Sequence, residues 1–343
     1  MKEMGWGQTP YKPPRLQRGM GIGVFSASSP VSVDSPTRYL RGKQQYLQQQ
    51  GFRVVDGKLF GKADSYRSGS IRERAEELND LLHDDRVDVL MASIGGNNTN
   101  SILPYLDYDY LRTHPKLIVG YSDTTALLLA VYARTGLVTF YGPSLAASFG
   151  EFPPFVDETF QNFWKVTSGE EEIPYRYPQP PFWTEEFIDW EQQDRPKKAL
   201  PNRWRCVRPG RAEGRLIGGN LNTMEGIFGT PYMPEIKQGD ILLLEDCCKN
   251  ASTIERSFSL LKLAGVFDRV GGVLLGKHER FDDSGTGRRP DEILLEVLGE
   301  REIPILADFD SCHTHPMLTM PIGCRVALDA ENKQVQLLEM PVT

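Results

Sequence analysis

The sequence has few of the features that mark a membrane, secreted or nucleic-acid-binding protein. No stretch approaches the roughly 18 consecutive apolar residues of a membrane span, and the N-terminal residues lack the apolar segment of a signal peptide. The formal net charge is −7 and 40% of the residues are hydrophobic, so neither a nucleic-acid partner nor an anionic membrane is indicated. We therefore expect a soluble acidic protein of the cytoplasm.

Cysteine and histidine are also scarce. The five cysteines include no C-x-x-C pair, which argues against a disulfide framework or a zinc site. Among the five histidines only His313 and His315 lie close together, and apart from Cys312 no further ligand at metal-binding spacing accompanies them. The sequence therefore predicts free thiols, no bound metal and no cofactor.

What the sequence does contain is a regular alternation of apolar runs and helical patterns. Strand patterns in GIGVF, FRVV, DVLMA and KLIVG alternate with helical segments, of which the clearest begins at Ser70, where Ser70 and Glu73 form a capping-box pattern. Strands that alternate with helices predict a mostly parallel sheet covered on both faces. Ligands bind such sheets at the carboxyl ends of the strands.

Changes in composition divide the chain into four parts. Residues 1–20 are rich in proline, glycine and basic groups and predict an extended arm. Residues 21–170 carry the alternating pattern of an α/β domain. Residues 171–212 contain many prolines, aromatics and a basic run, and they predict a linker with a substrate loop. Residues 213–343 contain short apolar runs separated by turns, which predict a smaller β-rich domain that ends in a hairpin across residues 330–333.

Ser122 lies at an unusual joint between a buried strand and a helix. In the stretch KLIVGYSDTTALLLAVYA the serine follows a strand pattern directly, as in a nucleophile elbow, which holds a serine hydroxyl at the top of a sheet. Only half of that motif is present, because its second glycine is missing. The alternative is that Ser122 or Asp123 caps the helix, and this stretch alone favours the cap.

Two further residues offer the partners that a nucleophilic serine needs. Glu245 ends an apolar run, where an unpaired carboxylate is costly, and His313 lies in a loop fixed by prolines. Taken singly, each suits an ordinary structural role equally well. Together with Ser122 they supply a hydroxyl, a base and a carboxylate. The backbone amides of Gly96 and Asp123 are candidates for an oxyanion hole.

Six ordered blocks of the sequence resemble the LD-carboxypeptidase family of serine peptidases. They are RERAEELNDLLHDDRVDVLMASIGG, LPYLDYDYL, LIVGYSDTTAL, GRLIGGNLNTM, ILLLEDCCK and CHTHPMLTMPIG. The resemblance implies a flavodoxin-like or amidotransferase-like N-terminal domain, a smaller β-rich C-terminal domain and a homodimer. It also implies that Ser122, Glu245 and His313 form the catalytic triad and that Gly96 and Asp123 supply the oxyanion amides.

Departures within these blocks resemble one branch of the family. SIGGNNTNS stands where murein-cleaving members have an Arg-Gly-Gly-Tyr-Gly-like block, Cys312 stands where they have glycine, and His315 stands where an aspartate is common. The first change, with GGNLNTMEGIFGTPYMP and FWTEEFIDW, resembles the microcin C self-immunity branch. That branch hydrolyses the amide between a terminal aspartyl residue and a nucleotide, an acyl-sulfamoyl or phosphoramidate linkage, and so destroys aminoacyl-adenylate mimics. The alternatives are a murein tetrapeptide carboxypeptidase of cell-wall recycling and a binding protein without activity.

Five residues are candidates for contacts with such a small peptide-nucleotide or murein peptide substrate. Trp183 and Trp190 each offer an aromatic face to a nucleobase, and Lys249 offers a cation to phosphate oxygens or a carboxylate. Asn220 and Glu279 lie in loop-like ends of matching blocks. The two tryptophans suit anchors of a surface loop equally well.

Overall fold

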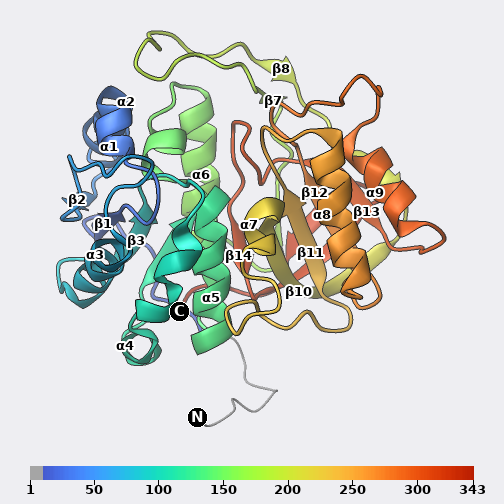
Figure 1. The fold of residues 1–343 in the computed structure, drawn as a ribbon, viewed down its shortest axis with the longest axis horizontal. Coiled ribbons are helices and arrows are strands. Elements are labelled where there is room, and N and C mark those ends of the chain that lie inside the picture. The colour runs from blue at the N-terminus through green and yellow to red at the C-terminus, as the bar shows by residue number, and fades with distance from the viewer. Residues whose placement is uncertain (1–10) are drawn as a thin grey trace.

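The computed structural model describes residues 11–343 and contains two large β-sheets, one in each half of the chain (Figure 1). The N-terminal sheet and its helices occupy the left of the view, and the strand-rich C-terminal part occupies the right. Residues 1–10 of the expected N-terminal arm lie outside the described residues. From Tyr11 onward this segment contacts the first half, since Tyr11 N donates to Gly136 O at 3.0 Å and Leu16 is buried.

The first sheet has six strands in the order β14-β5-β4-β3-β1-β2. The five strands from the N-terminal half are parallel to their neighbours, whereas β14 pairs antiparallel with β5. The parallel sheet predicted from the alternating pattern is therefore confirmed. The strand bounds are β1 Gly21–Phe25, β2 Arg53–Asp56, β3 Val89–Ala92, β4 Leu117–Gly120, β5 Thr139–Tyr141 and β14 Met320–Ile322.

The helices of this half connect the parallel strands and cover the sheet. The longer α-helices are α3 Ile71–His83, α5 Thr125–Thr135 and α6 Phe155–Ser168. The shorter segments are α1 Val31–Asp34, α2 Pro36–Leu40, η1 Arg41–Leu47, η2 Thr99–Tyr105, α4 Tyr108–Thr113, η3 Ser122–Thr124 and η4 Leu145–Phe149. The predicted capping box at the start of α3 is confirmed, because Glu73 N donates to Ser70 Oγ and Ser70 N donates to the Glu73 carboxylate. No helix within residues 11–343 is long and apolar enough to cross a membrane.

The second sheet has eight strands in the order β6-β16-β15-β10-β11-β12-β13-β9. Its centre, from β10 to β13, is parallel, and β15 with β16 forms the hairpin predicted at the C-terminus. The strand bounds are β6 Tyr175–Arg176, β9 Arg205–Arg208, β10 Arg211–Asn220, β11 Ile241–Glu245, β12 Gly272–Gly276, β13 Ile305–Phe309, β15 Arg325–Asp329 and β16 Gln334–Leu337. The helices are α7 Leu221–Glu225, α8 Ala251–Leu263 and α9 Pro290–Leu298.

A two-stranded ribbon, β7 Phe182–Trp183 with β8 Leu200–Pro201, closes a long loop at the top of the view in Figure 1. We call residues 184–199 the insert loop. The chain does not divide as cleanly as the composition suggested. Strand β14 joins the first sheet although it lies late in the chain, while β6 and β9, from the expected linker, belong to the second sheet.

The two halves share one continuous apolar core, which contains strand residues of both sheets. Strand β10 approaches α5 of the first half closely, because Gly219 has no side chain. A Cβ added at Gly219 would lie 2.8 Å from the Thr125 side chain and 3.0 Å from the Tyr141 ring. This close approach brings the carboxyl ends of β4 and β11 together, and the candidate site lies there.

Candidate active site

Ser122, His313 and Glu245 form one hydrogen-bonded chain that spans the two sheets. His313 Nε2 lies 2.9 Å from Ser122 Oγ, and His313 Nδ1 lies 2.6 Å from Glu245 Oε2. Ser122 follows β4, Glu245 ends β11, and His313 lies in the loop between β13 and β14. An acceptor at Nδ1 places the proton there and leaves Nε2 free to accept the serine proton.

Ser122 has the backbone conformation of a strained turn. Its φ is +59°, a left-handed value that is uncommon for a residue with a side chain. The alternative of a helix cap is wrong, since neither Ser122 nor Asp123 makes a side-chain capping bond to α5. The Asp123 carboxylate instead accepts the backbone N–H groups of Asn98 and Thr99, each at 2.8 Å, and so fixes the loop after β3.

Glu245 is a fully buried carboxylate whose two oxygens are both occupied. Oε2 accepts from the His313 ring and from His313 N, and Oε1 accepts from Tyr141 Oη at 2.6 Å and from Asn220 Nδ2 at 3.0 Å. Burial acts to raise the pKa of Glu245, but the His313 charge and these hydrogen bonds outweigh it and lower the pKa. Burial likewise acts to lower the pKa of His313, but the Glu245 carboxylate and, after it, the neighbouring Cys247 side chain reverse that effect and raise the pKa well above its ordinary value.

The loop after β3 lies directly against the serine. A Cβ added at Gly95 would lie 2.8 Å from Ser122 Oγ and 3.1 Å from Asp123 N. Gly96 has φ +150° and its added Cβ would collide with Ser28, so glycine is required at that position too. The N–H groups of Gly96 and Asp123 donate to no other group of residues 11–343, which leaves them available to an oxyanion.

Asn220 ends strand β10 and lies beside Glu245. Its side-chain amide donates to Glu245 Oε1, its side-chain oxygen accepts from Thr223 N at the start of α7, and the residue is 4% exposed. The Asn220 side chain therefore helps to fix the Glu245 carboxylate. A contact between Asn220 and a substrate stays a prediction.

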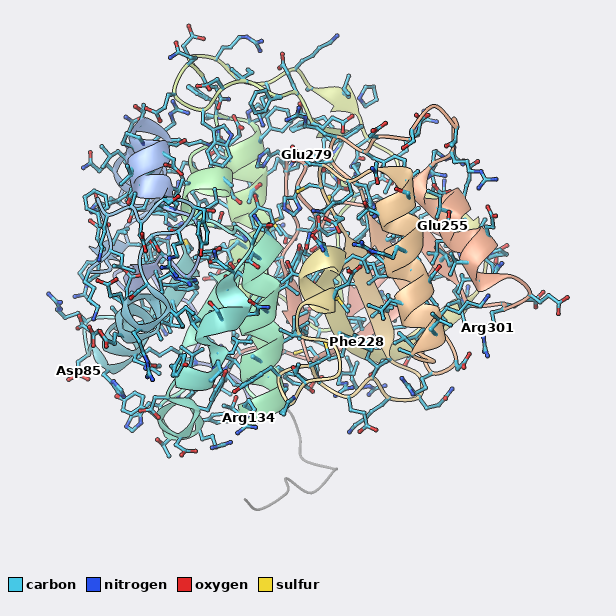
Figure 2. All side chains as sticks on the ribbon, in the orientation of Figure 1. Asp85, Arg134, Phe228, Glu255, Glu279 and Arg301 are labelled. Atoms are coloured by element: carbon cyan, nitrogen blue, oxygen red, sulfur yellow. The ribbon has the colours of Figure 1, made fainter. Side chains whose placement is uncertain are left out.

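Lys249 and Glu279 are both partly exposed. The Lys249 ammonium makes no ion pair with another residue of the described range and lies near the buried Asp246 carboxylate. Figure 2 shows Glu279 between the two halves of the molecule, near the top of the view. Burial raises the pKa of Glu279, while the charges of His313 and Lys197 act in the opposite direction. A contact of Lys249 and Glu279 with a substrate stays a prediction.

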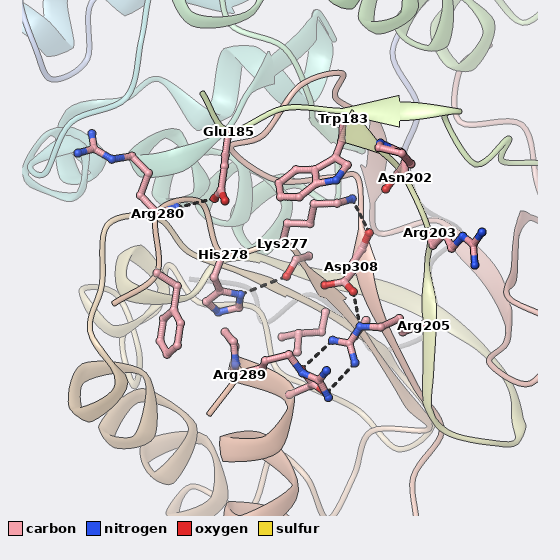
Figure 3. Close-up of a pocket in the computed structure, with 17 residues that line it drawn as sticks. Trp183, Glu185, Asn202, Arg203, Arg205, Lys277, His278, Arg280, Arg289 and Asp308 are labelled. Carbon is pink, nitrogen blue, oxygen red and sulfur yellow. Dashed lines mark hydrogen bonds and ion pairs between the residues drawn. The ribbon is translucent and has the colours of Figure 1, made fainter. Parts of the chain in front are cut away.

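Trp183 lines a separate cavity of about 470 Å³ in the C-terminal half (Figure 3). The Lys277 ammonium lies 5.3 Å from the centre of its ring, and Arg205, His278 and Asp308 are among the other lining residues. None of the three triad residues lines this cavity. Trp183 therefore has the Lys277 cation on one ring face and borders a cavity that none of these three residues lines. Its contact with a nucleobase stays a prediction.

Trp190 lies in the insert loop and packs on Arg38 of the first half. The guanidinium carbon lies 4.4 Å from the ring centre, and the Arg38 side chain is fully buried. Glu191 and Gln193 follow Trp190 and bond to the α2 segment, Glu191 through Thr37 and Gln193 through Arg38. Both tryptophans are therefore held on one face by a cation.

His315 joins the insert loop to the loop that carries His313. His315 and Thr184 exchange backbone hydrogen bonds of 2.8 and 3.2 Å. Burial lowers the pKa of the His315 ring to about 3, so the ring is neutral near pH 7. Its Nε2 lies 3.9 Å from the Glu151 carboxylate, and its Nδ1 is buried without a partner among residues 11–343.

The five cysteines are free thiols, and within the described part of the chain no group of three His, Cys, Asp or Glu side chains is arranged to hold a metal ion. His313 and His315 also point to different partners, Glu245 and Glu151. The close pair of histidines in the sequence is thus not a joint ligand pair.

The chain matches known protein families and solved structures. The family model described as the LD-carboxypeptidase N-terminal domain matches residues 22–142, and the model of the LD-carboxypeptidase C-terminal domain matches residues 213–328. The chain belongs to the LD-carboxypeptidase family. It is therefore a hydrolase of the serine peptidase class. The N-terminal match covers β1 to β5 of the first sheet, and the C-terminal match covers β10 to β15, which include β14 of the first sheet.

Among members of the LD-carboxypeptidase family, the chain is 55% identical to a carboxypeptidase homologue of Vibrio cholerae over 322 residues, 94% of this chain and 96% of that protein. It is 51% identical to the microcin C7 self-immunity protein MccF of Escherichia coli over 326 residues, 94% of each chain. The solved structure of MccF in complex with aspartyl sulfamoyl adenosine matches with a TM-score of 0.95 and 49% identity, covering 97% of this chain and 100% of that one.

Two polar residues behind the triad were missed by sequence reasoning. Tyr141 donates to Glu245, and Asp246 accepts from Asn222 N and Asn220 Nδ2. Burial and the neighbouring Glu245 charge raise the pKa of Asp246 to about 6. Tyr141 reads as an ordinary strand residue in a run of apolar residues, so nothing in the local pattern marks it. Asp246 adjoins Glu245 in the sequence. A second acidic residue beside a buried carboxylate could have indicated that Asp246 also belongs to the site.

Proposed function

We propose that this chain is a serine amidase that hydrolyses the amide between an aspartyl residue and a nucleotide, and so confers resistance to microcin C-like aminoacyl-adenylate mimics. The observation that carries the proposal is the chain of hydrogen bonds from Ser122 Oγ through His313 to Glu245. The 51% identity to the self-immunity protein MccF supports the choice of substrate. MccF itself has been solved with aspartyl sulfamoyl adenosine and with glutamyl sulfamoyl guanosine.

In the proposed reaction Ser122 Oγ attacks the carbonyl carbon of the scissile amide while its proton passes to His313 Nε2. The carbonyl oxygen becomes an oxyanion, which accepts the free N–H groups of Gly96 and Asp123. The imidazolium, stabilised by Glu245, then gives its proton to the leaving nitrogen, and the C–N bond breaks. Water, deprotonated by His313, attacks the acyl-enzyme and releases the aspartyl product and Ser122.

The residues around the triad suit a ligand with an amino acid at one end and a nucleotide at the other. Glu279, beside His313, is placed to accept an α-ammonium group, and Lys249 is placed to meet a sulfamoyl or phosphate oxygen. Trp183 and Trp190 each have one face on a cation and offer the other to a base. The proposal needs no metal and no cofactor, so a chelator should leave turnover unchanged.

The second candidate is a murein tetrapeptide carboxypeptidase with the same chemistry. It is supported by family membership and by 25% identity to the murein tetrapeptide carboxypeptidase of Pseudomonas aeruginosa over 309 residues. A binding protein without activity is disfavoured because the serine, imidazole and carboxylate are already hydrogen-bonded to one another. We also propose a cytoplasmic homodimer, as the family resemblance implies.

A side-by-side assay tests the proposal. Purified protein is incubated with aspartyl sulfamoyl adenosine and with a murein tetrapeptide, and products are measured by mass spectrometry against a Ser122→Ala control. We expect aspartate and sulfamoyl adenosine from the first compound, with a higher kcat/KM than for the tetrapeptide. A preference for the tetrapeptide would replace the immunity function with cell-wall recycling. Hydrolysis of neither compound, with the protein folded, would refute both.

A further inference from the structure

Tyr141 lies where the three segments that carry the proposed triad converge. Its backbone pairs with Gly120 of β4, just before Ser122, and on the other side with Met320 of β14, which follows the His313 loop. Its ring extends from the first sheet toward the second, where Oη donates to Glu245 Oε1 at 2.6 Å. Tyr141 therefore contacts all three segments, as His313 does through its two ring nitrogens.

The Tyr141 hydroxyl also touches the backbone of the serine. Ser122 N donates to Tyr141 Oη over a longer distance of 3.4 Å. The side chain is fully buried, and the neighbouring strand β10 admits it because position 219 is a glycine with φ +145°. One O–H group therefore accepts from the residue that carries the nucleophile and donates to the carboxylate that orients the base.

We propose that Tyr141 is a positioning residue whose hydroxyl couples the Ser122 backbone to the Glu245 carboxylate across the two sheets. The inference rests on the proposed function, because it assigns Tyr141 its role through the triad. Ser122 holds a left-handed φ, a conformation that persists only where surrounding contacts fix it. Glu245 Oε1 has Tyr141 and Asn220 as its donors, and removal of the phenol leaves one.

The Tyr141→Phe variant removes this hydroxyl and keeps the ring. We expect kcat to fall about 10- to 100-fold, the rate equivalent of a hydrogen bond to a charged group. KM should change little, because the fully buried side chain lies behind the triad and out of reach of substrate. With one hydrogen-bond donor fewer, the Glu245 carboxylate stabilises the His313 imidazolium more strongly and raises the pKa of His313. The acid limb of the profile, which is the fall of kcat/KM toward low pH, should therefore move to higher pH.

Tyr177→Phe is the matched control. Tyr177 is also a buried tyrosine, and its hydroxyl donates to Thr319 O at 3.1 Å without contact to the triad. Tyr177→Phe loses one buried hydrogen bond and Tyr141→Phe loses two, and the melting temperature of each variant measures the cost in stability. Only Tyr141→Phe should lower kcat and shift the acid limb; equal behaviour of the two variants would overturn the inference.

A double-mutant cycle with Glu245→Gln supplies the second measurement. If Tyr141 acts through Glu245, then Tyr141→Phe should cost much less in the Glu245→Gln background than in the native enzyme. Fully additive losses would overturn the inference even where the single variant is less stable. Ser122→Ala is assayed in parallel, because residual turnover in that variant would refute the proposed function itself and not only the role of Tyr141.

Discussion

The Arg38 guanidinium and the Glu151 carboxylate form an ion pair in which neither side chain is exposed, with 3.0 Å between Nη2 and Oε2. The Lys197 ammonium of the insert loop lies 3.3 Å from the same carboxylate, and Trp190 packs on the same guanidinium. The pair is thus the point at which the insert loop is attached to the first half. Through Thr184 and His315 that loop also reaches the segment that carries His313.

Glu151→Gln tests this attachment. The substitution leaves the buried Arg38 and Lys197 charges without their partner, and breaking such a pair costs about 3 to 5 kcal/mol. We expect a loss of that order in the free energy of unfolding, measured with urea, and a lower kcat/KM for aspartyl sulfamoyl adenosine. Glu213→Gln is the control, since its pair with Arg325 is 62% exposed on both sides and should matter by less than about 1 kcal/mol.

Ser122→Ala should abolish hydrolysis and leave the fold intact, because it removes one hydroxyl from a half-buried position. The loss in kcat should be on the order of 10³-fold or more, since members of a triad act as a unit. Turnover is measured by product release, and folding by circular dichroism. Unchanged turnover in the folded variant would eliminate Ser122 as the nucleophile.

The pH profile should report the His313–Glu245 pair. His313 must be neutral to accept the serine proton, so kcat/KM falls as pH drops through the pKa of His313. Because Glu245 raises that pKa, the limb should lie above the ordinary imidazole value of about 6.5. Glu245→Gln removes the carboxylate, so it should move the limb to lower pH and reduce kcat on the order of 10²-fold or more. A flat profile between about pH 5 and 8, with chemistry rate-limiting, contradicts this role.

Gly95→Ala should reduce turnover, because the added methyl group would clash with the Ser122 side chain. The backbone at residue 95 does not need a left-handed conformation, yet an added Cβ would lie 2.8 Å from Ser122 Oγ. The same Cβ would lie 2.7 Å from Ser122 Cβ, so Ser122 must shift. We expect a folded variant with a lowered melting temperature whose kcat falls at least about 10-fold, since misplaced reacting groups are costly. Calorimetry measures the melting temperature, and the aspartyl sulfamoyl adenosine assay measures turnover. Native turnover in the variant would show that the reaction does not need the space between residue 95 and the Ser122 hydroxyl.

Trp183→Ala separates the two candidate substrates. Stacking of a base on an aromatic ring is worth roughly 1 to 3 kcal/mol, so kcat/KM for an aspartyl-adenylate mimic should fall roughly 5- to 150-fold. Hydrolysis of a simple aspartyl amide without a base should hardly change. The ratio of the two specificity constants is the informative quantity. An unchanged ratio would show that Trp183 does not bind the base, and Trp190→Ala is then measured in the same way.

The sequence predicted the fold well because its indications are local. Apolar runs, the Ser70 capping box and the alternation of strands with helices each depend on neighbouring residues, and the sheet follows from them. The residues of the proposed triad were predicted from the chemistry of their side chains and from the family resemblance. What could not be predicted depends on contacts across the interface between the sheets: the hydroxyl of Tyr141, the hydrogen bond of Asn220 to Glu245, and the position of Trp183 beside a separate cavity.

The placement of β14 has a further consequence for how such a chain can be made and altered. During synthesis β5 remains an unpaired sheet edge until Met320–Ile322 leaves the ribosome, and the base of the proposed triad arrives only shortly before it. The halves are therefore not interchangeable modules. A chimera joined near residue 212 would have to match the edge of one parent's sheet to the return strand of the other.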